Sequence, residues 1–275
     1  MALKDLLVIV DNDPACPARV EIARRLAEKH EAHLTGLHAM PRPVPLYTDM
    51  PVPQAVETAQ WQDLQAAAAR AEALFHAGTR GTTARTEWRV AEGHVIEVAS
   101  VHARYADLTV LGQGIDIGQA SAALDVLPAE LALAVGRPLL LVPRYGTFPT
   151  VGEHVLVAWN GSREATRAVH DALPLLERAK VVTVLSIDPE DTGEPRMPGG
   201  DIALHLSRHG VPVQTAAVKG ADVAVGDLLL SYAADHGIDL IVMGAYGHTR
   251  LREMILGGAT RDLLRSMTVP VLLSH

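Results

Sequence analysis

Short apolar runs alternate with stretches of helical apolar spacing along the chain. Residues 6–10 form a continuous aliphatic run that ends at turn-forming residues, and apolar positions recur with helical spacing over 18–29. The next apolar run covers 33–40. This strand, helix, strand order predicts parallel crossovers in an α/β sheet that is covered by helices on both faces. Further strands are predicted at 86–90, 108–111 and 138–142, with a helix at about 94–105.

The same order restarts after residue 154. Strands are predicted at 155–159, 181–187, 213–218, 240–243 and 270–273, with helices at 163–176 and 223–235 and a short helix after Gly257. Residues 107–112 align with 239–244 at an offset of 244 − 112 = 132, and Pro138 aligns with Pro270 at the same offset. The chain is therefore predicted to contain two copies of one domain, residues 1–148 and 149–275.

The first copy is longer than the second. Asp11 and Asn160 end the two first strands and lie 160 − 11 = 149 residues apart, so the first half carries 149 − 132 = 17 extra residues. The surplus is predicted within 41–78, where a proline-marked loop precedes an Ala-rich helical pattern at 54–76. That helix could be a surface cover for the sheet, or a partner-binding helix or lid.

Composition narrows the class of protein. Of the 275 residues, 48% are hydrophobic and 20% charged, which predicts a folded chain. A net charge of −8 argues against nucleic-acid binding. The single Cys16 excludes an internal disulfide and fits a reducing cytoplasm. No apolar run approaches the roughly 20 residues of a membrane span, and the first apolar run is too short for a signal peptide.

The glycine-rich segment 244–260 carries the most informative chemistry. It follows the predicted strand 240–243 and leads into the last short helix. Glycines at such a place let the chain turn sharply and let a ligand approach main-chain N–H groups. Gly257 and Gly258 lie where the helix begins, and the free N–H groups and dipole at that end favour an anion such as a phosphate. Thr260 can donate its hydroxyl to that anion or serve as an N-cap.

The spacing of Gly244, Gly247 and Gly257 resembles the nucleotide-binding signature of the universal stress protein family. The whole chain resembles a tandem member of that family, with an open, Rossmann-like, parallel five-stranded sheet in each half. The resemblance implies that ATP, with or without Mg²⁺, lies across the carboxyl ends of the strands in the second half. It assigns ligand contacts to Ala158, Trp159, Asn160, Ile187, Met243, Gly244, Gly247, His248, Gly257, Gly258, Ala259 and Thr260.

Two positions depart from the family pattern. Asn160 stands where the family has an Asp near the ribose, and Gly258 stands where a Ser or Thr is usual beside the phosphates. Either change could weaken ATP binding or alter which nucleotide is preferred. Residues 160–162 also fit a simple turn and helix N-cap. His248, with Tyr246, Arg250 and Arg252, could close over the ligand or belong to a solvated loop.

The first half serves as an internal control, because its phosphate segment is overwritten. At the offset of 132, Gly257 corresponds to Asp125 and Gly258 to Val126, which bring a negative charge and a branched side chain. Likewise, Ile115 and Pro128 replace Gly247 and Thr260, although Pro128 suits the first turn of a helix. Asp11 alone keeps the family carboxylate. One nucleotide site per chain is predicted, in the second half.

The leading functional prediction is a cytoplasmic universal stress protein that uses ATP as a regulatory ligand. The alternative is a nucleotide-free scaffold, and a third class is an uncharacterised related enzyme. No catalytic acid, base or nucleophile stands out and no Walker segment occurs, so fast hydrolysis is not predicted. A cluster of His30, His33 and His38 lacks the spacing of a zinc site, and Cys16 is interpreted as a passive small residue. The resemblance also implies pairing of the two halves through 138–142 and 270–273; a homodimer and a protein partner stay open.

Overall fold

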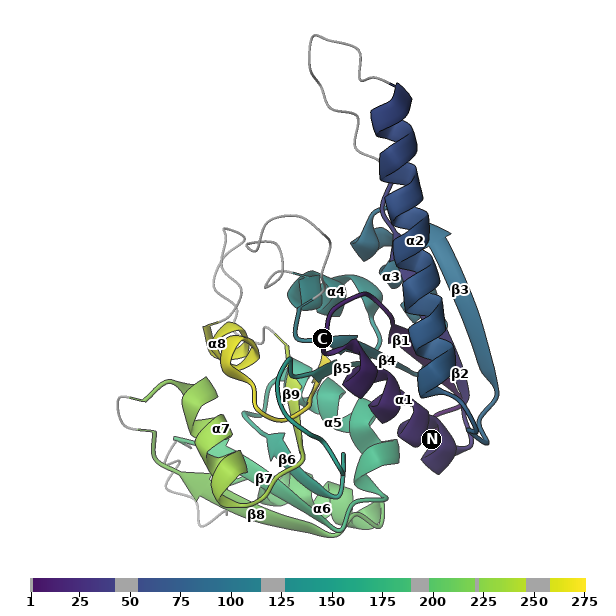
Figure 1. The fold of residues 1–275 in the computed structure, drawn as a ribbon. Coiled ribbons are helices and arrows are strands. Elements are labelled where there is room, and N and C mark those ends of the chain that lie inside the picture. Colours follow the sequence, from purple (N-terminus) through teal and green to yellow (C-terminus); the bar gives the residue numbers. More distant parts are fainter. Residues whose placement is uncertain (1, 43–53, 115–126, 189–197, 221–222, 246–257) are drawn as a thin grey trace.

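The computed structural model describes residues 2–42, 54–114, 127–188, 198–220, 223–245 and 258–275 (Figure 1). In the first half these residues form β1 (Asp5–Ile9), α1 (Cys16–His30), β2 (His33–Met40), α2 (Gln54–Gly78), β3 (Thr86–Glu92), α3 (Val95–Ala103), β4 (Leu108–Gly112), α4 (Leu127–Val135) and β5 (Leu139–Val142). The second half contributes β6 (His154–Ala158), α5 (Arg163–Leu176), β7 (Val181–Ile187), α6 (Gly200–Arg208), β8 (Val213–Val218), α7 (Val225–Asp235), β9 (Leu240–Gly244), α8 (Gly258–Ser266) and β10 (Val271–Ser274).

The strands join into one sheet in the order β3-β2-β1-β4-β5-β10-β9-β6-β7-β8. Each half is a parallel five-stranded set, as predicted, and the two sets meet where β10 pairs antiparallel with β5. The order within a half reverses direction between the first and fourth strands. In such sheets this switch point opens a crevice at the carboxyl ends, where ligands bind. The two switch points lie between β1 and β4 and between β6 and β9.

Helices cover both faces of the sheet. One hydrophobic cluster contains residues of α1, α2, α5 and α6, and the other contains residues of α3, α4, α7 and α8. Alternate residues of a strand feed the two clusters: Val155 and Val157 belong to the first, and Leu156 to the second. The long aliphatic runs of the sequence therefore reflect strands that are buried on both sides.

The duplication is visible in matching backbone caps. The Asp107 carboxylate accepts hydrogen bonds from the N–H groups of Lys4 and Asp5, at 2.7 and 3.1 Å. In the second half the Asp239 carboxylate accepts from the N–H groups of Gly152, Glu153 and His154. The two aspartates are 239 − 107 = 132 residues apart. Asp107 and Asp239 are thus equivalent residues, and each connects the start of the fourth strand of its half to the start of the first strand.

The sequence located most elements within two residues of their bounds in the structure, but it did not predict helices α4 and α6. The surplus of the first half lies where it was predicted, after β2. β2 and β3 begin 86 − 33 = 53 residues apart, against 213 − 181 = 32 for β7 and β8. The β1 to β2 interval is longer by one residue, 33 − 5 = 28 against 181 − 154 = 27, and the β3 to β4 interval is shorter by five, 108 − 86 = 22 against 240 − 213 = 27, so the net surplus is 17.

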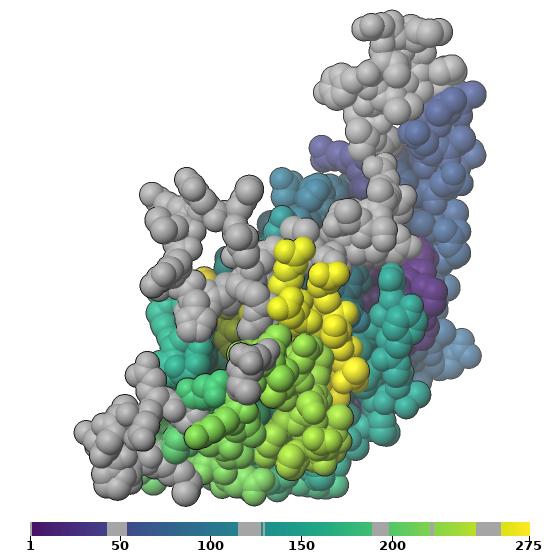
Figure 2. Space-filling view, turned by 90° about the vertical axis from the view of Figure 1, so that its left-hand side faces the viewer, coloured from purple at the N-terminus to yellow at the C-terminus, as the bar shows by residue number. Residues whose placement is uncertain are grey.

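Helix α2 takes up much of that surplus, with 25 residues against nine in α6. Its buried side chains, Ala68, Ala71 and Phe75, lie in its C-terminal half, while residues 54–67 include none that is buried. Figure 1 and Figure 2 both show the first turns of α2, in blue, extending beyond the other helices and strands. Among the helices that the structure describes, none has the length and apolar character needed to cross a membrane.

Candidate functional site

Three of the predicted ligand-contacting residues share one face of the sheet in the second half. Val157 pairs with Val242, so the next residues, Ala158 and Met243, both point to the opposite face. Ala158 also pairs with Leu185, which places Ile187 on the same face two residues further along β7. Met243 is buried, and Ala158 and Ile187 are half-buried against the same hydrophobic cluster. This face offers an apolar surface at the carboxyl end of the strands.

Trp159 points to the other face. Its side chain packs against the cluster beneath α5 and α6, beside the left-handed Gly199 that begins α6. Its backbone N–H donates to Leu185 O at 2.9 Å and extends the β6–β7 ladder by one residue. The structure therefore does not bring the Trp159 side chain together with Ala158, Ile187 and Met243.

Gly244 ends β9 where the chain meets the first turn of α5. A Cβ at this position would lie 2.4 Å from the Glu164 carbonyl carbon and 2.5 Å from the Ala165 nitrogen. Because both atoms are backbone, no side-chain movement could relieve the contact. Gly244 is thus required by close packing of α5 on the strand, a reason beyond the sharp turn and the ligand approach that the sequence predicted.

Residues 160–162 form the predicted turn and N-cap. The Ser162 N–H donates to Asn160 Oδ1 at 3.1 Å, Gly161 adopts φ +70°, and Ser162 Oγ accepts from the Ala165 N–H at 3.1 Å. Asn160 is exposed, and its amide oxygen serves the turn. Its NH₂ group is the part of the side chain that can donate to a ligand.

Helix α8 begins at Gly258, as the sequence predicted, so Gly258, Ala259 and Thr260 form its first turn. Thr260 is buried, and Leu263 and Leu264 anchor the helix in the core beside α7. Figure 2 shows α7, in light green, against the yellow segment of α8 and β10. Gly247, His248 and Gly257 lie outside the described residues, so their predicted roles stay predictions.

In the first half, the equivalent crevice contains a buried ion pair. Asp11 follows β1 as Asn160 follows β6, and its carboxylate accepts two hydrogen bonds from the Arg19 guanidinium, at 2.8 and 3.1 Å. Arg19 is 1% exposed and Asp11 is 4% exposed. Burial alone would lower the pKa of Arg19, but the charge and hydrogen bonds of Asp11, together with the neighbouring Cys16 and Asp13, outweigh it, and the pKa is raised. The carboxylate that the resemblance places near the ribose is therefore already hydrogen-bonded within the protein.

The Arg19 guanidinium also covers the end of β4. A Cβ on Gly112 would lie 3.2 Å from Arg19 Nη1 and 2.8 Å from Gly114 O. Gly112 corresponds to Gly244, so the two glycines allow different neighbours: an arginine in the first half and a helix backbone in the second. At the offset of 149, Arg19 corresponds to Ala168, which is buried and carries a single methyl group.

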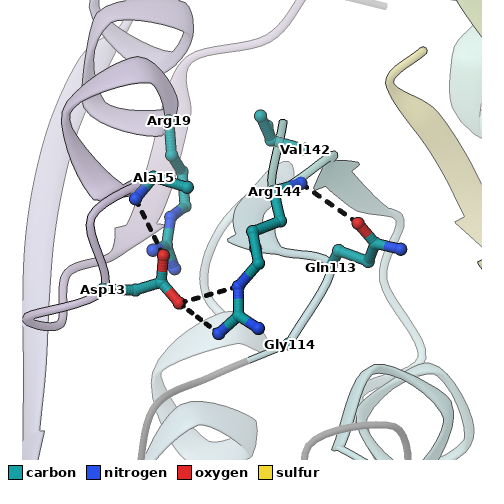
Figure 3. A pocket seen from close by; sticks show the side chains of 8 residues that line it. Asp13, Ala15, Arg19, Gln113, Gly114, Val142 and Arg144 are labelled. Carbon is teal, nitrogen blue, oxygen red and sulfur yellow. Dashed lines mark hydrogen bonds and ion pairs between the residues drawn. The ribbon is translucent and has the colours of Figure 1, made fainter. Parts of the chain in front are cut away.

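A second polar chain lines the small pocket beside this ion pair (Figure 3). Asp13 Oδ2 accepts from Arg144 Nη2 at 2.6 Å and from Nε at 3.2 Å, while Asp13 Oδ1 accepts from the Ala15 N–H at 2.8 Å. The Arg144 N–H in turn donates to Gln113 Oε1 at 3.1 Å. The pocket has about 10 Å³ of free volume, roughly the room of one water molecule. Sequence analysis missed Arg19, Gln113 and Arg144; a buried arginine on the apolar face of α1 was the available signal.

The other candidate groups behave as core residues. His38 is buried, and its Nδ1 lies 2.8 Å from Val10 O. Burial, and then the neighbouring cations, lower the pKa of His30 to about 4, so its imidazole is neutral at pH 7. Cys16 is buried, and burial raises the pKa of its thiol to about 11, so the thiol is protonated at pH 7. Among the described residues, no group of histidine, cysteine and carboxylate side chains is arranged to hold a metal.

Two parallel five-stranded α/β units in tandem, each with a switch-point crevice, define a duplicated Rossmann-like protein. The model of the universal stress protein family matches residues 2–114 and 152–275. The chain belongs to the universal stress protein family.

Known relatives agree in sequence and in fold. Universal stress protein Slr1230 of Synechocystis is 27% identical over 142 residues, which are 50% of this chain and 47% of that protein. The match thus spans about half the length of this relative. A universal stress protein from Archaeoglobus fulgidus has a TM-score of 0.73 at 12% identity, with 98% of this chain and 96% of that chain covered. A functionally unknown protein from Pseudomonas aeruginosa has a TM-score of 0.63 at 15% identity, covering 99% and 92%.

Proposed function

We propose that the second half of this universal stress protein binds ATP, or a related adenine nucleotide, as a regulatory ligand in a cytoplasmic stress response. The contrast between the two switch points supports this proposal. In the first half, the crevice between β1 and β4 holds the Asp11–Arg19 pair. In the second half, the equivalent positions are the exposed Asn160 and the small Ala168, beside the glycine segment that follows β9.

The residues at this end of the second half suit the parts of a nucleotide. Ala158, Ile187 and Met243 offer an apolar face for the base, and the Asn160 amide can donate to a ribose hydroxyl. The N–H groups in the first turn of α8 have no partner within the helix and lie at the positive end of its dipole, which favours phosphates. The sequence adds Gly244, Gly247, His248, Gly257, Gly258, Ala259 and Thr260 to the phosphate segment.

The ligand is proposed to regulate rather than to react. A hydrolase would need a positioned base or a metal to activate water; the sequence singles out no catalytic base, and no group of the described histidine, cysteine and carboxylate side chains is arranged to hold a metal. Mg²⁺ would then enter with the nucleotide phosphates. A nucleotide-free scaffold is the second candidate, and the projecting first turns of α2, where no residue of 54–67 is buried, favour it.

Calorimetric titration of the full chain with ATP, ADP and AMP, with and without Mg²⁺, tests the proposal. One ATP per chain is expected. Gly257→Val should abolish binding, because a branched side chain would stand where the phosphates approach the backbone. Asp125→Val, at the equivalent position of the first half, is the matched control and should bind ATP like the wild type. Two ATP per chain, or a folded Gly257→Val variant with full affinity, would overturn the site, and no binding at all would favour the scaffold.

A further inference from the structure

Residues of the first half contact α8, the helix of the second half whose first turn is proposed to bind the phosphates. Gln113 follows β4, and its Nε2 donates to Leu264 O at 2.7 Å and to Arg265 O at 3.0 Å. Both carbonyls belong to the last turn of α8 (Gly258–Ser266). Carbonyls in the last turn of a helix have no partner within the helix, so a side-chain amide there fixes the position of that end.

Gln113 itself is held at two points, and the residue at the second point is held in turn. Its backbone N–H donates to Val142 O at 2.9 Å, which continues the ladder between β4 and β5. Its Oε1 accepts a hydrogen bond from the Arg144 N–H. This bond fixes the orientation of the side-chain amide, so that the NH₂ group points toward α8. The Arg144 guanidinium is in turn bound by the buried Asp13 (Figure 3). The amide therefore needs little reordering to hold α8.

The opposite end of α8 is the phosphate end. The helix has nine residues, so its two ends lie about 13 Å apart. A helix this short moves as one body, and a shift at Leu264 and Arg265 displaces the N–H groups of the first turn. Charge-dipole contacts and hydrogen bonds to an anion are sensitive to such displacement.

We propose that Gln113 is a positioning residue for the nucleotide site, and that the Asp13–Arg144–Gln113 chain lets the first half set the affinity of the second half for nucleotide phosphates. This inference rests on the proposed function. It gives the first half, whose own crevice is closed, a role in ligand binding. It also predicts that the effect of Gln113 falls on the phosphates and not on the base.

The chain offers a matched control for a contact of the same kind in the other direction. Arg167 on α5 donates from Nη2 to Gly136 O at 3.1 Å, just beyond the end of α4. This contact also crosses between the halves and also holds the end of a helix that precedes a last strand. It acts on α4 and not on α8, so Arg167→Ala removes a contact between the halves without touching the phosphate helix.

The experiment compares Gln113→Ala, Gln113→Leu and Arg167→Ala in the full chain. ATP and adenosine, each with Mg²⁺ present, are titrated calorimetrically, and amide hydrogen exchange is measured in the ligand-free proteins. For both Gln113 variants we expect ATP affinity to fall about fivefold, adenosine affinity to stay unchanged, and exchange in α8 to rise. Arg167→Ala should match the wild type in both affinities.

Three results would overturn the inference: unchanged ATP affinity in both Gln113 variants, an equal loss for ATP and adenosine, or an equal loss of ATP affinity in Arg167→Ala. The exchange measurement separates this inference from the proposed function. If the wild type binds no nucleotide, the proposed function fails; faster exchange in α8 of the Gln113 variants would still support positioning of the helix, and unchanged exchange would overturn it.

Discussion

The two crevices of this protein lie at equivalent points of the same fold and have opposite contents. Between β1 and β4, Asp11 and Arg19 form a buried, doubly hydrogen-bonded ion pair. Between β6 and β9, Asn160 and Ala168 stand at the corresponding positions. Duplication alone would give two like sites. The difference shows how one arginine on the buried face of a helix closes a crevice, because it fills space and takes up the carboxylate at once.

The largest effect is expected from breaking the pair in the first half. Arg19→Ala leaves the Asp11 carboxylate buried without a counter-charge, which should cost about 3–5 kcal/mol of unfolding free energy. Urea unfolding at pH 7 measures this. The double variant Asp11→Asn, Arg19→Met removes both charges and should recover most of the loss. If Arg19→Ala unfolds at the wild-type urea concentration, the pair does not hold the crevice.

A smaller effect is expected at the glycine that ends β9. Gly244→Ala places a Cβ 2.4–2.5 Å from backbone atoms of α5, and the helix must shift. Such overpacking costs roughly 1–3 kcal/mol. Gly112→Ala in the first half meets Gly114 O at 2.8 Å and should be milder. Thermal unfolding of the two variants checks the order, and equal melting temperatures would show that the helix contact does not explain Gly244.

The comparison can also be reversed by exchanging the contents of the crevices. Asn160→Asp with Ala168→Arg rebuilds the ion pair of the first half in the second half. We expect ATP affinity to drop about tenfold or more, because the new guanidinium would fill part of the crevice and bind the carboxylate at position 160, which would otherwise face the ribose. The opposite exchange, Asp11→Asn with Arg19→Ala, should create no second site, since Asp125 and Val126 replace the phosphate glycines. Calorimetric stoichiometry tests both, and two ATP per chain in the second variant would contradict the role given to the glycines.

Local patterns were enough to predict the duplicated fold. Helix α5 and strands β2, β7 and β8 have the predicted bounds, because their apolar periodicity coincides with what they bury. Helix α6 was missed because only Ile202 and Leu206 of its nine residues are buried, too few to mark a period. The offsets of 132 and 149 identified which residues of the two halves occupy equivalent positions at the crevices. They do not show which side chains contact one another.

Contacts across the crevice could not be predicted from local spacing or from the offsets. Arg19 lies eight residues from Asp11, and sequence alone does not say that the two side chains meet. Gln113 and Leu264 are 151 residues apart and come from different halves. The direction of Trp159 depends on strand register, which the sequence left open. The elements were predictable from local spacing, whereas the polar pairs that distinguish the two halves depend on tertiary packing.

The smallest expected effect distinguishes the two helix starts that follow the crevices. Asp13 and Ser162 are 162 − 13 = 149 residues apart, and each accepts a hydrogen bond from a backbone N–H near the start of its helix.

Burial would raise the pKa of Asp13, but the hydrogen bonds from Arg144 and the Ala15 N–H outweigh it, and the pKa is lowered. A carboxyl with a lowered folded-state pKa stabilises the fold above its unfolded pKa, and this contribution is lost as pH falls through the folded value. Urea unfolding from pH 6 to pH 3 should therefore lose stability less steeply in Asp13→Asn than in the wild type. Ser162→Ala should instead lose about 1 kcal/mol at every pH, because a hydroxyl cap does not titrate in this range. Parallel pH profiles for Asp13→Asn and the wild type would show that the Asp13 charge adds no stability.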